Sequence, residues 1–295
     1  MKMQYKRIIS MALAIAAVGA APMMFASCSP AADKGDVSSD EPDAATTEPI
    51  TEPVTEPVTT ESPERTLSIR VGTYNIKHAA DAGGDLSVIG NVIKESGVAI
   101  CGVQEVDYMT TRSGGADQPA LLAEAAGMEY YKFTPAIDYQ GGKYGTLILS
   151  HYAIVDFEYI PLYSGGKEGR AIGHAKINVD GCIIDFFNTH LSYEEKALRT
   201  KQFGAIRKML DKCEHYILTA DFNTQDFSEF DALGYGALVN NSSHKYATFP
   251  KSNSAIDNIV LSDGFKIGRI STVANSHSDH RMLWSDLKLT YTPDK

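Results

Sequence analysis

Short apolar runs recur through most of the chain and predict a fold built from many strands. Leu67–Val71 alternates between apolar and polar residues, as a half-buried strand does, and Val98–Val103 is continuously apolar, as a buried strand is. The same reasoning predicts further strands near residues 129–134, 144–150, 154–160, 171–179, 182–188, 215–220, 256–262, 267–273 and 283–291. A chain with so many strands has to bury extended sheet faces against other layers.

Helical patterns separate some of these runs. Asp85 can cap a helix that ends before Gly97, a second helix is predicted from Asp117 to Gly127, and a third over residues 194–212. Because strands occur early and late in the chain with helices between them, we predict an α/β fold with two sheets and helices outside them. Periodicity alone does not distinguish this arrangement from other α/β folds.

The N-terminus indicates an export signal followed by a lipidation site. Three basic residues among the first seven precede an apolar stretch at residues 8–21, which is too short for a typical membrane-spanning helix. Phe25-Ala26-Ser27-Cys28 resembles a bacterial lipobox, with Phe where Leu is usual. We predict a lipoprotein signal peptide at residues 1–27, with lipidated Cys28 anchoring an extracytoplasmic protein to a bacterial membrane. The alternative is an ordinary cleaved signal with an incidental Cys28.

Residues 28–65 are predicted to form an acidic, disordered Thr/Glu/Pro-rich stalk. Residues 29–64 carry ten acidic residues and one Lys, and Thr-Glu-Pro-Ile/Val repeats three times from Thr47. Few large apolar residues are present there, so burial cannot offset the entropy of ordering. Residues 66–295 are predicted to be one domain. Residues 65–295 have a net charge of −4, without the basic excess that tracks a nucleic-acid backbone.

The cysteines after Cys28 are Cys101, Cys182 and Cys213. Their odd number and wide spacing indicate neither a disulfide framework nor a zinc motif. We therefore predict that they are small core residues.

Polar residues stand at the ends of several predicted strands. Asn75, Glu105, His190 and Asp221 each come directly after an apolar run, and Asp279-His280 precedes the last one. Strands hold such side chains rigidly at one edge of a sheet, where binding and catalytic sites are commonly built. A single Asp or Asn at a strand end is more often a turn former. Five such positions in one domain favour a site.

The sequence around these positions resembles the endonuclease/exonuclease/phosphatase superfamily over about residues 67–292. Six blocks occur in order: Thr73-Tyr74-Asn75-Ile76, Val103-Gln104-Glu105-Val106, Asn188-Thr189-His190-Leu191, Ala220-Asp221-Phe222-Asn223, Ile256-Asp257-Asn258-Ile259 and Ser278-Asp279-His280. The resemblance implies a four-layer αββα sandwich of two mainly antiparallel sheets flanked by helices, and a hydrolase of phosphoester bonds. Residues 113–118 and 139–145 resemble a bacterial subgroup that is similar to the hydrolase-like domain of GPI-anchor lipid remodelling proteins.

Two segments depart from the family pattern. Ala220 replaces the usual Gly before Asp-Phe-Asn, and the usual Gly-Asn-Ala-Ile-Leu-Ser-Arg block is Gly145-Thr146-Leu147-Ile148-Leu149-Ser150-His151 here. Neither change removes a residue matched to a catalytic role. The loss of that Asn and Arg can alter how the surroundings of the substrate phosphate are recognised.

The resemblance implies a metal site. Asn75 and Glu105, with Asp279 as a further candidate, offer hard oxygen ligands, which suit Mg²⁺, Mn²⁺ or Ca²⁺. We predict Mg²⁺ or Mn²⁺ as the cofactor. The metal would bind a non-bridging phosphate oxygen and stabilise developing charge.

It also implies five catalytic residues. Asp221 would orient and deprotonate the attacking water, and Asn223 would donate a hydrogen bond to the phosphate. His280 would be an imidazolium partner of the phosphate, with Asp257 accepting from its other ring nitrogen. His190 would be a second phosphate donor or a general acid for the leaving oxygen. Taken alone, His190 could equally be a structural histidine.

His78, Arg112 and Arg170 are further candidates for substrate binding. His78 could line the cleft or face water, and the two arginines could bind a substrate anion or be surface residues. We predict an extracytoplasmic, metal-dependent phosphodiesterase that acts on nucleic acid, a phospholipid head group or a small diester. We expect a monomer that meets the membrane only through its lipid anchor.

Two alternatives remain for the function. One is a lipid hydrolase like phospholipase C or sphingomyelinase, although no long apolar hairpin for membrane insertion is evident. The other is a binding lipoprotein that keeps the fold without chemistry, which the intact motifs disfavour.

Overall fold

The computed structural model describes residues 63–293. The predicted signal peptide, the lipidation site Cys28 and almost all of the predicted stalk lie outside these residues. The first strand begins at Arg65, the last residue of the predicted stalk. Among the described residues, no helix has the length and the hydropathy needed to span a membrane.

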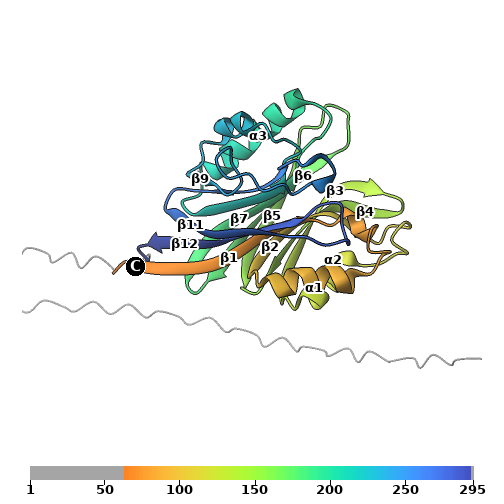
Figure 1. The fold of residues 1–295 in the computed structure, drawn as a ribbon, viewed down its shortest axis with the longest axis horizontal. Helices are drawn as coiled ribbons and strands as arrows, with labels where there is room; N and C mark the ends of the chain where they lie inside the picture. The colour runs from red at the N-terminus through yellow and green to blue at the C-terminus, as the bar shows by residue number, and fades with distance from the viewer. Residues whose placement is uncertain (1–62, 294–295) are drawn as a thin grey trace, which may run out of the picture. The chain divides into compact units, whose positions relative to one another are not determined.

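Two six-stranded sheets form the centre of the domain (Figure 1). The first sheet contains, in spatial order, β11 (Phe265–Val273), β12 (Met282–Tyr291), β1 (Arg65–Asn75), β2 (Ile100–Tyr108), β4 (Gly142–Ser150) and β3 (Tyr130–Tyr139). The second contains β5 (Ile154–Leu162), β6 (Arg170–Val179), β7 (Cys182–His190), β8 (Tyr216–Asp221), β10 (Asp257–Leu261) and β9 (Ala237–Leu238). Within the described domain, β1–β2 and β7–β8 are parallel pairs and the other pairs are antiparallel.

Helices cover the outer face of each sheet. They are α1 (Leu86–Ser96), α2 (Gln118–Ala126) and α3 (Lys196–Leu210), with short 3₁₀ helices η1 (Lys77–Ala79), η2 (Phe227–Leu233) and η3 (Pro250–Ser252) in the loops. Asp85 and Asp117 accept backbone N–H groups as N-caps, and Gly97 and Gly127 end the helices in the left-handed conformation. The predicted ends of α1 and α2 are therefore confirmed.

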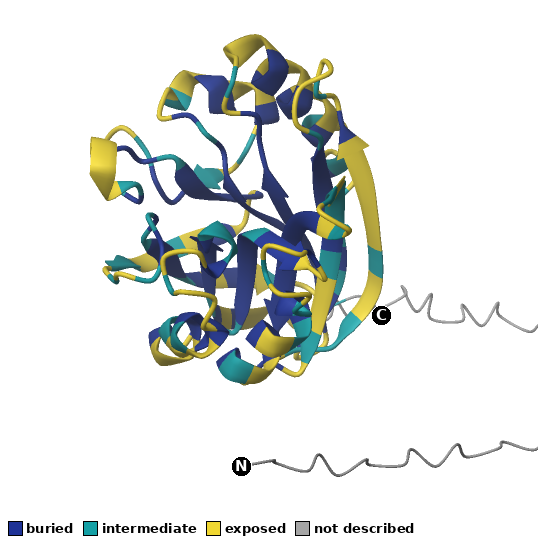
Figure 2. Ribbon diagram, turned by 90° about the vertical axis from the view of Figure 1, so that its right-hand side faces the viewer, coloured by how far each residue is buried: buried dark blue, intermediate teal, exposed yellow. Residues whose placement is uncertain are grey.

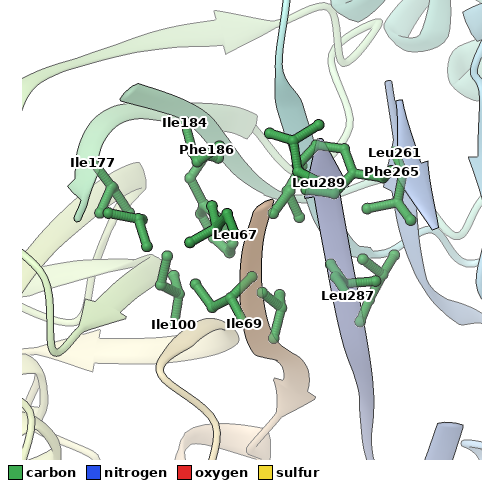
Figure 3. Close-up of a cluster of buried hydrophobic side chains, with 14 of the residues drawn as sticks. Leu67, Ile69, Ile100, Ile177, Ile184, Phe186, Leu261, Phe265, Leu287 and Leu289 are labelled. Atoms are coloured by element: carbon green, nitrogen blue, oxygen red, sulfur yellow. The ribbon is translucent and has the colours of Figure 1, made fainter. Parts of the chain in front are cut away.

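Apolar clusters join the layers into the predicted αββα sandwich, which is confirmed. Between the sheets, Ile69 of the first packs with Phe186 of the second (Figure 3). On the outer faces, Ile89 of α1 packs against the first sheet and Phe203 of α3 against the second. Figure 2 shows buried strands between helices with exposed outer surfaces. Fully burying one such side chain contributes roughly 1.5–3 kcal/mol, so the layers are held mainly by apolar burial.

A buried polar network fixes the spacing of the two sheets where β2 and β7 cross. The amide of Asn188 donates to two backbone carbonyls of the first sheet at 3.0 Å each, and its oxygen accepts from Gln104 at 2.7 Å. Gly102 permits this approach, because a Cβ there would lie 2.0 Å from Oγ1 of Thr219. The next residues along β2 and β7 are therefore held at a defined separation.

One strand differs from the prediction in a way that matters for the site. The prediction ends a strand at Val103, but β2 continues to Tyr108 through an irregularity between Val103 and Val106. Glu105 lies in this irregularity with φ of 58°, in the left-handed region that favours glycine. Such bulges redirect side chains and recur near active sites. Glu105 therefore lies within a strand and not after its end.

Candidate active site

The predicted site residues meet at one edge of the two sheets. Asn75 ends β1, His190 ends β7 and Asp221 ends β8, while Asp257 begins β10 and His280 precedes β12. β10 is antiparallel to β8, and β12 is antiparallel to β1, so the starts of the later strands lie beside the ends of the earlier ones. Asp221 is paired in register with both His190 and Asp257. Strand pairing therefore gathers the residues of each sheet, and the packing of the two sheets brings Asn75 and His280 against Asp221.

Asp257 holds His280 from behind. The Nδ1 atom of His280 lies 2.9 Å from Oδ2 of Asp257, and its Nε2 lies 3.7 Å from Oδ2 of Asp221. Burial by itself would lower the pKa of His280, but the charge and the hydrogen bond of Asp257 outweigh it and raise the pKa to about 10. The ring is therefore an imidazolium that donates to Asp257 and turns its other N–H towards Asp221.

His190 has the opposite surroundings. Its Nδ1 lies 3.3 Å from a guanidinium nitrogen of Arg170, and its Nε2 lies 3.5 Å from Oδ2 of Asp221. Burial, together with the positive charge of Arg170, lowers the pKa of His190 to about 3. A guanidinium can only donate, so Nδ1 carries the lone pair and Nε2 carries the proton. The amide nitrogen of Asn223 also lies 2.9 Å from Nε2, but it can donate instead to the carbonyl of Leu191 at 2.9 Å.

Asp221 lies between the two rings and is almost fully buried. Its Oδ2 accepts from the amide of Asn75 at 3.0 Å, and its Oδ1 accepts from the backbone N–H of Asn223 at 2.9 Å. Burial, with the neighbouring carboxylate of Asp257, raises the pKa of Asp221 to about 7. A carboxylate with this pKa can accept and release a proton near neutral pH.

Glu105 is the ionised oxygen donor of the site. One carboxylate oxygen accepts from the amide of Asn75 at 3.0 Å, and the other lies 3.7 Å from Nδ1 of His78. Burial by itself would raise the pKa of Glu105, but His78, the charge on His190 when protonated and the Asn75 hydrogen bond together lower it to about 2. Glu105 therefore stays charged over the physiological range, as a cation ligand must.

The other two predicted metal ligands are engaged with Lys77. The ammonium of Lys77 lies 3.1 Å from Asp279, whose side chain is partly exposed. The backbone N–H of Lys77 donates to Oδ1 of Asn75 at 3.0 Å. The amide nitrogen of Asn75 therefore faces the carboxylates, and its oxygen faces the backbone.

The three candidates for substrate binding lie in different settings. His78 borders the site beside Glu105. Arg112 is held by Asp107 through two contacts of 2.7 Å and lies over the ring of Tyr139. Arg170 is 3% exposed and pairs with Glu168 at 2.8 Å, so it acts on the site through His190 as the structure stands.

Several supporting residues are not found by the sequence reasoning. The hydroxyl of Ser278 donates to the backbone carbonyl of Asn75 at 2.7 Å, and the hydroxyl of Thr248 accepts from the backbone N–H of Asp257 at 3.1 Å. The ring of Phe249 lies 4.9 Å from that of His280, between centroids. Ser278 could have been found from its place in the Ser-Asp-His block. Thr248 and Phe249 carry no such signal because they lie in a loop outside the six blocks.

A buried carboxylate flanked by two histidines thus lies at one edge of an αββα sandwich. The model of the endonuclease/exonuclease/phosphatase family matches residues 72–280, so the chain belongs to that family. Its members are typically hydrolases that act on phosphoester bonds.

Solved structures share the fold. An endonuclease/exonuclease/phosphatase from Beutenbergia cavernae is 22% identical with a TM-score of 0.65, covering 77% of this chain and 73% of that one. A family member from Bacteroides vulgatus is 17% identical with a TM-score of 0.62, covering 76% and 99%. A mannosyl-6-phosphatase from Bacteroides thetaiotaomicron is 18% identical with a TM-score of 0.56, covering 74% and 99%. At these identities the similarity establishes the fold and not the substrate.

Proposed function

We propose that the protein is a metal-dependent hydrolase of phosphoester bonds, and specifically a phosphodiesterase. The observation that supports this most directly is the arrangement at Asp221. A buried carboxylate with a pKa near neutrality faces one cationic histidine and one neutral histidine. A proton acceptor beside two hydrogen-bond donors suits the attack of water on a phosphorus centre, where negative charge accumulates on the phosphate oxygens.

In this proposal each residue acts through a stated atom. Asp221 orients the attacking water and takes its proton. His280 donates from Nε2 to a phosphate oxygen, while Asp257 holds the ring and keeps it charged. His190 donates from Nε2 as a neutral imidazole, because a pKa of about 3 leaves it uncharged at neutral pH. The general-acid role is therefore less favoured for His190 than the role of phosphate donor, and Asn223 adds a neutral amide donor.

Glu105, Asp279 and the amide oxygen of Asn75 would hold Mg²⁺ or Mn²⁺. The donor set fits a hard cation, since every donor is an oxygen and Glu105 is ionised. When bound, the metal supplies positive charge to a non-bridging phosphate oxygen. Asn75 would need the opposite amide orientation to offer its oxygen, and Lys77 would have to release Asp279.

We also propose that the enzyme acts outside the cytoplasm as a lipoprotein anchored through Cys28. The sequence of residues 1–65 supports this proposal. The segments at 113–118 and 139–145 separately support the proposed kinship with bacterial relatives of GPI-anchor lipid remodelling proteins. The net charge of −4 over residues 65–295 favours small diesters over long nucleic acid, whose binding depends on many basic contacts.

The test is a comparison of substrates with and without metal. The full chain should hydrolyse bis-p-nitrophenyl phosphate with Mg²⁺ or Mn²⁺, lose the activity in excess chelator and regain it when metal is returned. Glu105→Gln should abolish this response, whereas Glu95→Gln, at an exposed position on α1, should not. Full activity in chelator would refute metal dependence.

Other substrates decide between the alternatives. Activity on monoesters alone would favour a phosphatase, and much faster cleavage of sphingomyelin would favour a lipid hydrolase. Duplex DNA degraded far faster than any small diester would identify a nuclease. Absence of hydrolysis on all of these, in a folded protein, would support the binding lipoprotein.

A further inference from the structure

A second group of potential metal ligands lies on the outer face of the second sheet. His174 is on β6, Asp185 is on β7 and Cys213 follows the end of α3. Their ligand atoms all lie within 4.8 Å of one another. All three side chains are at least partly shielded from solvent, and none belongs to the proposed active site. We propose that His174, Asp185 and Cys213 form a binding site for Zn²⁺ or a similar borderline transition-metal ion.

The orientation of His174 is the strongest support. Its Nε2–H donates to Oδ1 of Asp185 at 2.7 Å, so this nitrogen would have to lose its proton to bind a metal, and its Nδ1 lies 3.3 Å from Oε1 of Glu158. A histidine that binds a metal usually donates its other ring N–H to a carboxylate, which fixes the tautomer and the ring. Glu158 occupies that place. Stacking on Phe187, with centroids 4.1 Å apart and planes 11° from parallel, fixes the ring further.

The donor atoms and their spacing suit a tetrahedral ion. Zinc bonds of about 2.0–2.3 Å place tetrahedral ligand atoms about 3.3–3.8 Å from one another. Nε2 of His174 and Oδ1 of Asp185, now 2.7 Å apart, would have to separate by about 0.6 Å or more, whereas a pair near the 4.8 Å limit would have to approach by about 1 Å or more. One sulfur, one imidazole nitrogen and one carboxylate oxygen favour Zn²⁺ over Mg²⁺ or Ca²⁺. Three protein ligands leave a fourth position for water.

Lys176 is the present counter-charge of Asp185 and would have to be replaced. Its ammonium lies 2.8 Å from Oδ1 of Asp185, but the side chain is 42% exposed and can turn into solvent without becoming buried. The thiol of Cys213 must lose its proton to bind a metal as a thiolate. Metal binding then releases a proton, and affinity falls as the pH falls.

Cobalt(II) gives a test that the active site cannot imitate. A thiolate ligand produces an intense near-ultraviolet charge-transfer band with Co²⁺, and the proposed catalytic ligands contain no sulfur. The full chain should show this band at about one equivalent of Co²⁺ beyond the active-site metal. Cys213→Ser should remove it, and His174→Ala and Asp185→Asn should weaken it at least tenfold in apparent affinity, because the loss of even an outer-shell partner of a ligand typically costs that much. Zn²⁺ should displace the band.

Two control variants locate the signal. Cys28→Ser should keep the band, and Glu105→Gln should keep it while losing the response of hydrolysis to metal. Zn²⁺ should also slow alkylation of Cys213, which is partly exposed, whereas Cys101 and Cys182 are buried. Cys213→Ser should hydrolyse diesters like the parent chain. A folded chain without a thiolate band, or a band that survives Cys213→Ser, would overturn the proposal.

Discussion

Two histidines face the same oxygen of Asp221, yet one ring is a cation and the other is neutral. The Nε2 atoms of His280 and His190 lie 3.7 and 3.5 Å from Oδ2 of Asp221. Both rings are buried, which disfavours the charged form of each. Against that, Asp257 raises the pKa of His280 to about 10, whereas Arg170 adds to burial and lowers the pKa of His190 to about 3. The group behind each ring therefore decides its charge.

The largest loss of activity should come from changing Asp221, the residue that both histidines face. Asp221→Asn removes the proton acceptor and keeps the size of the side chain, so kcat should fall by about 10⁴, the upper end for an acid–base group. Steady-state kinetics on a small diester measure this, with circular dichroism to check the fold. Asp231→Asn, at an exposed position on η2, should stay close to the parent. A loss below tenfold in Asp221→Asn would remove Asp221 from the role of base.

The next largest loss of activity should come from the cationic histidine, His280, and the carboxylate that holds it. His280→Ala should lower kcat by about 10²–10⁴, and Asp257→Ala by somewhat less, because the ring remains but loses its charge and orientation. The two residues act as a unit, so the double variant should be no worse than His280→Ala. The kcat values of the parent, the two single variants and the double variant complete a double-mutant cycle. A double variant whose defect equals the product of the single defects would contradict the pairing.

Matched asparagine substitutions compare the two rings directly. His190→Asn replaces one neutral donor by another, so kcat should fall by no more than about a hundredfold, the value of one hydrogen bond to a charged group. His280→Asn replaces a cation by a neutral donor and should cost more. The ratio of the two losses in kcat is the measured quantity. Equal losses would mean that the two rings do not differ in charge in the working enzyme.

The strands, the helix ends and the αββα sandwich could be predicted from the sequence, the first two from local patterns and the sandwich from the resemblance to the family, and the candidate residues of the six blocks do meet at one edge of the sheets. Apolar periodicity gives the strands, Asp and Gly give the ends of α1 and α2, and the six blocks give the residues at the sheet edge. The irregularity at Glu105 could not be predicted, since it depends on the register between β2 and β4. The different charge states of His190 and His280 also could not be predicted, because Arg170 and Asp257 lie 20 and 23 residues away along the chain.

The place of Cys213 beside His174 and Asp185 could not be predicted either, because it also depends on residues far apart in the sequence. Its spacing from other cysteines gives no zinc motif, and the prediction made it a small core residue. In the structure Cys101 and Cys182 are buried and agree with that prediction, whereas Cys213 is only half-buried. Its neighbours His174 and Asp185 come from a hairpin of two strands, so the group forms only when α3 packs on that sheet.

A further effect should appear in stability, where the two histidines act at opposite ends of the pH scale. His280 has a folded pKa of about 10 against an ordinary value of 6.5, so its stabilising contribution is complete below pH 6.5 and is lost as the pH rises towards 10. His190 has a folded pKa of about 3, so it contributes nothing above pH 6.5. Below that, the unfolded chain takes up a proton that the folded chain refuses, and stability falls towards pH 3.

Each slope is at most about 1.4 kcal/mol per pH unit. Urea unfolding of the metal-free protein should therefore show a decline in the free energy of unfolding between pH 7 and pH 9 that His280→Asn flattens and His190→Asn leaves intact, while His190→Asn flattens the decline below pH 6. The comparison fails if His190→Asn alters the alkaline slope as much as His280→Asn does. In that case the charge of each ring would be set by the site as a whole and not by the residue directly behind it.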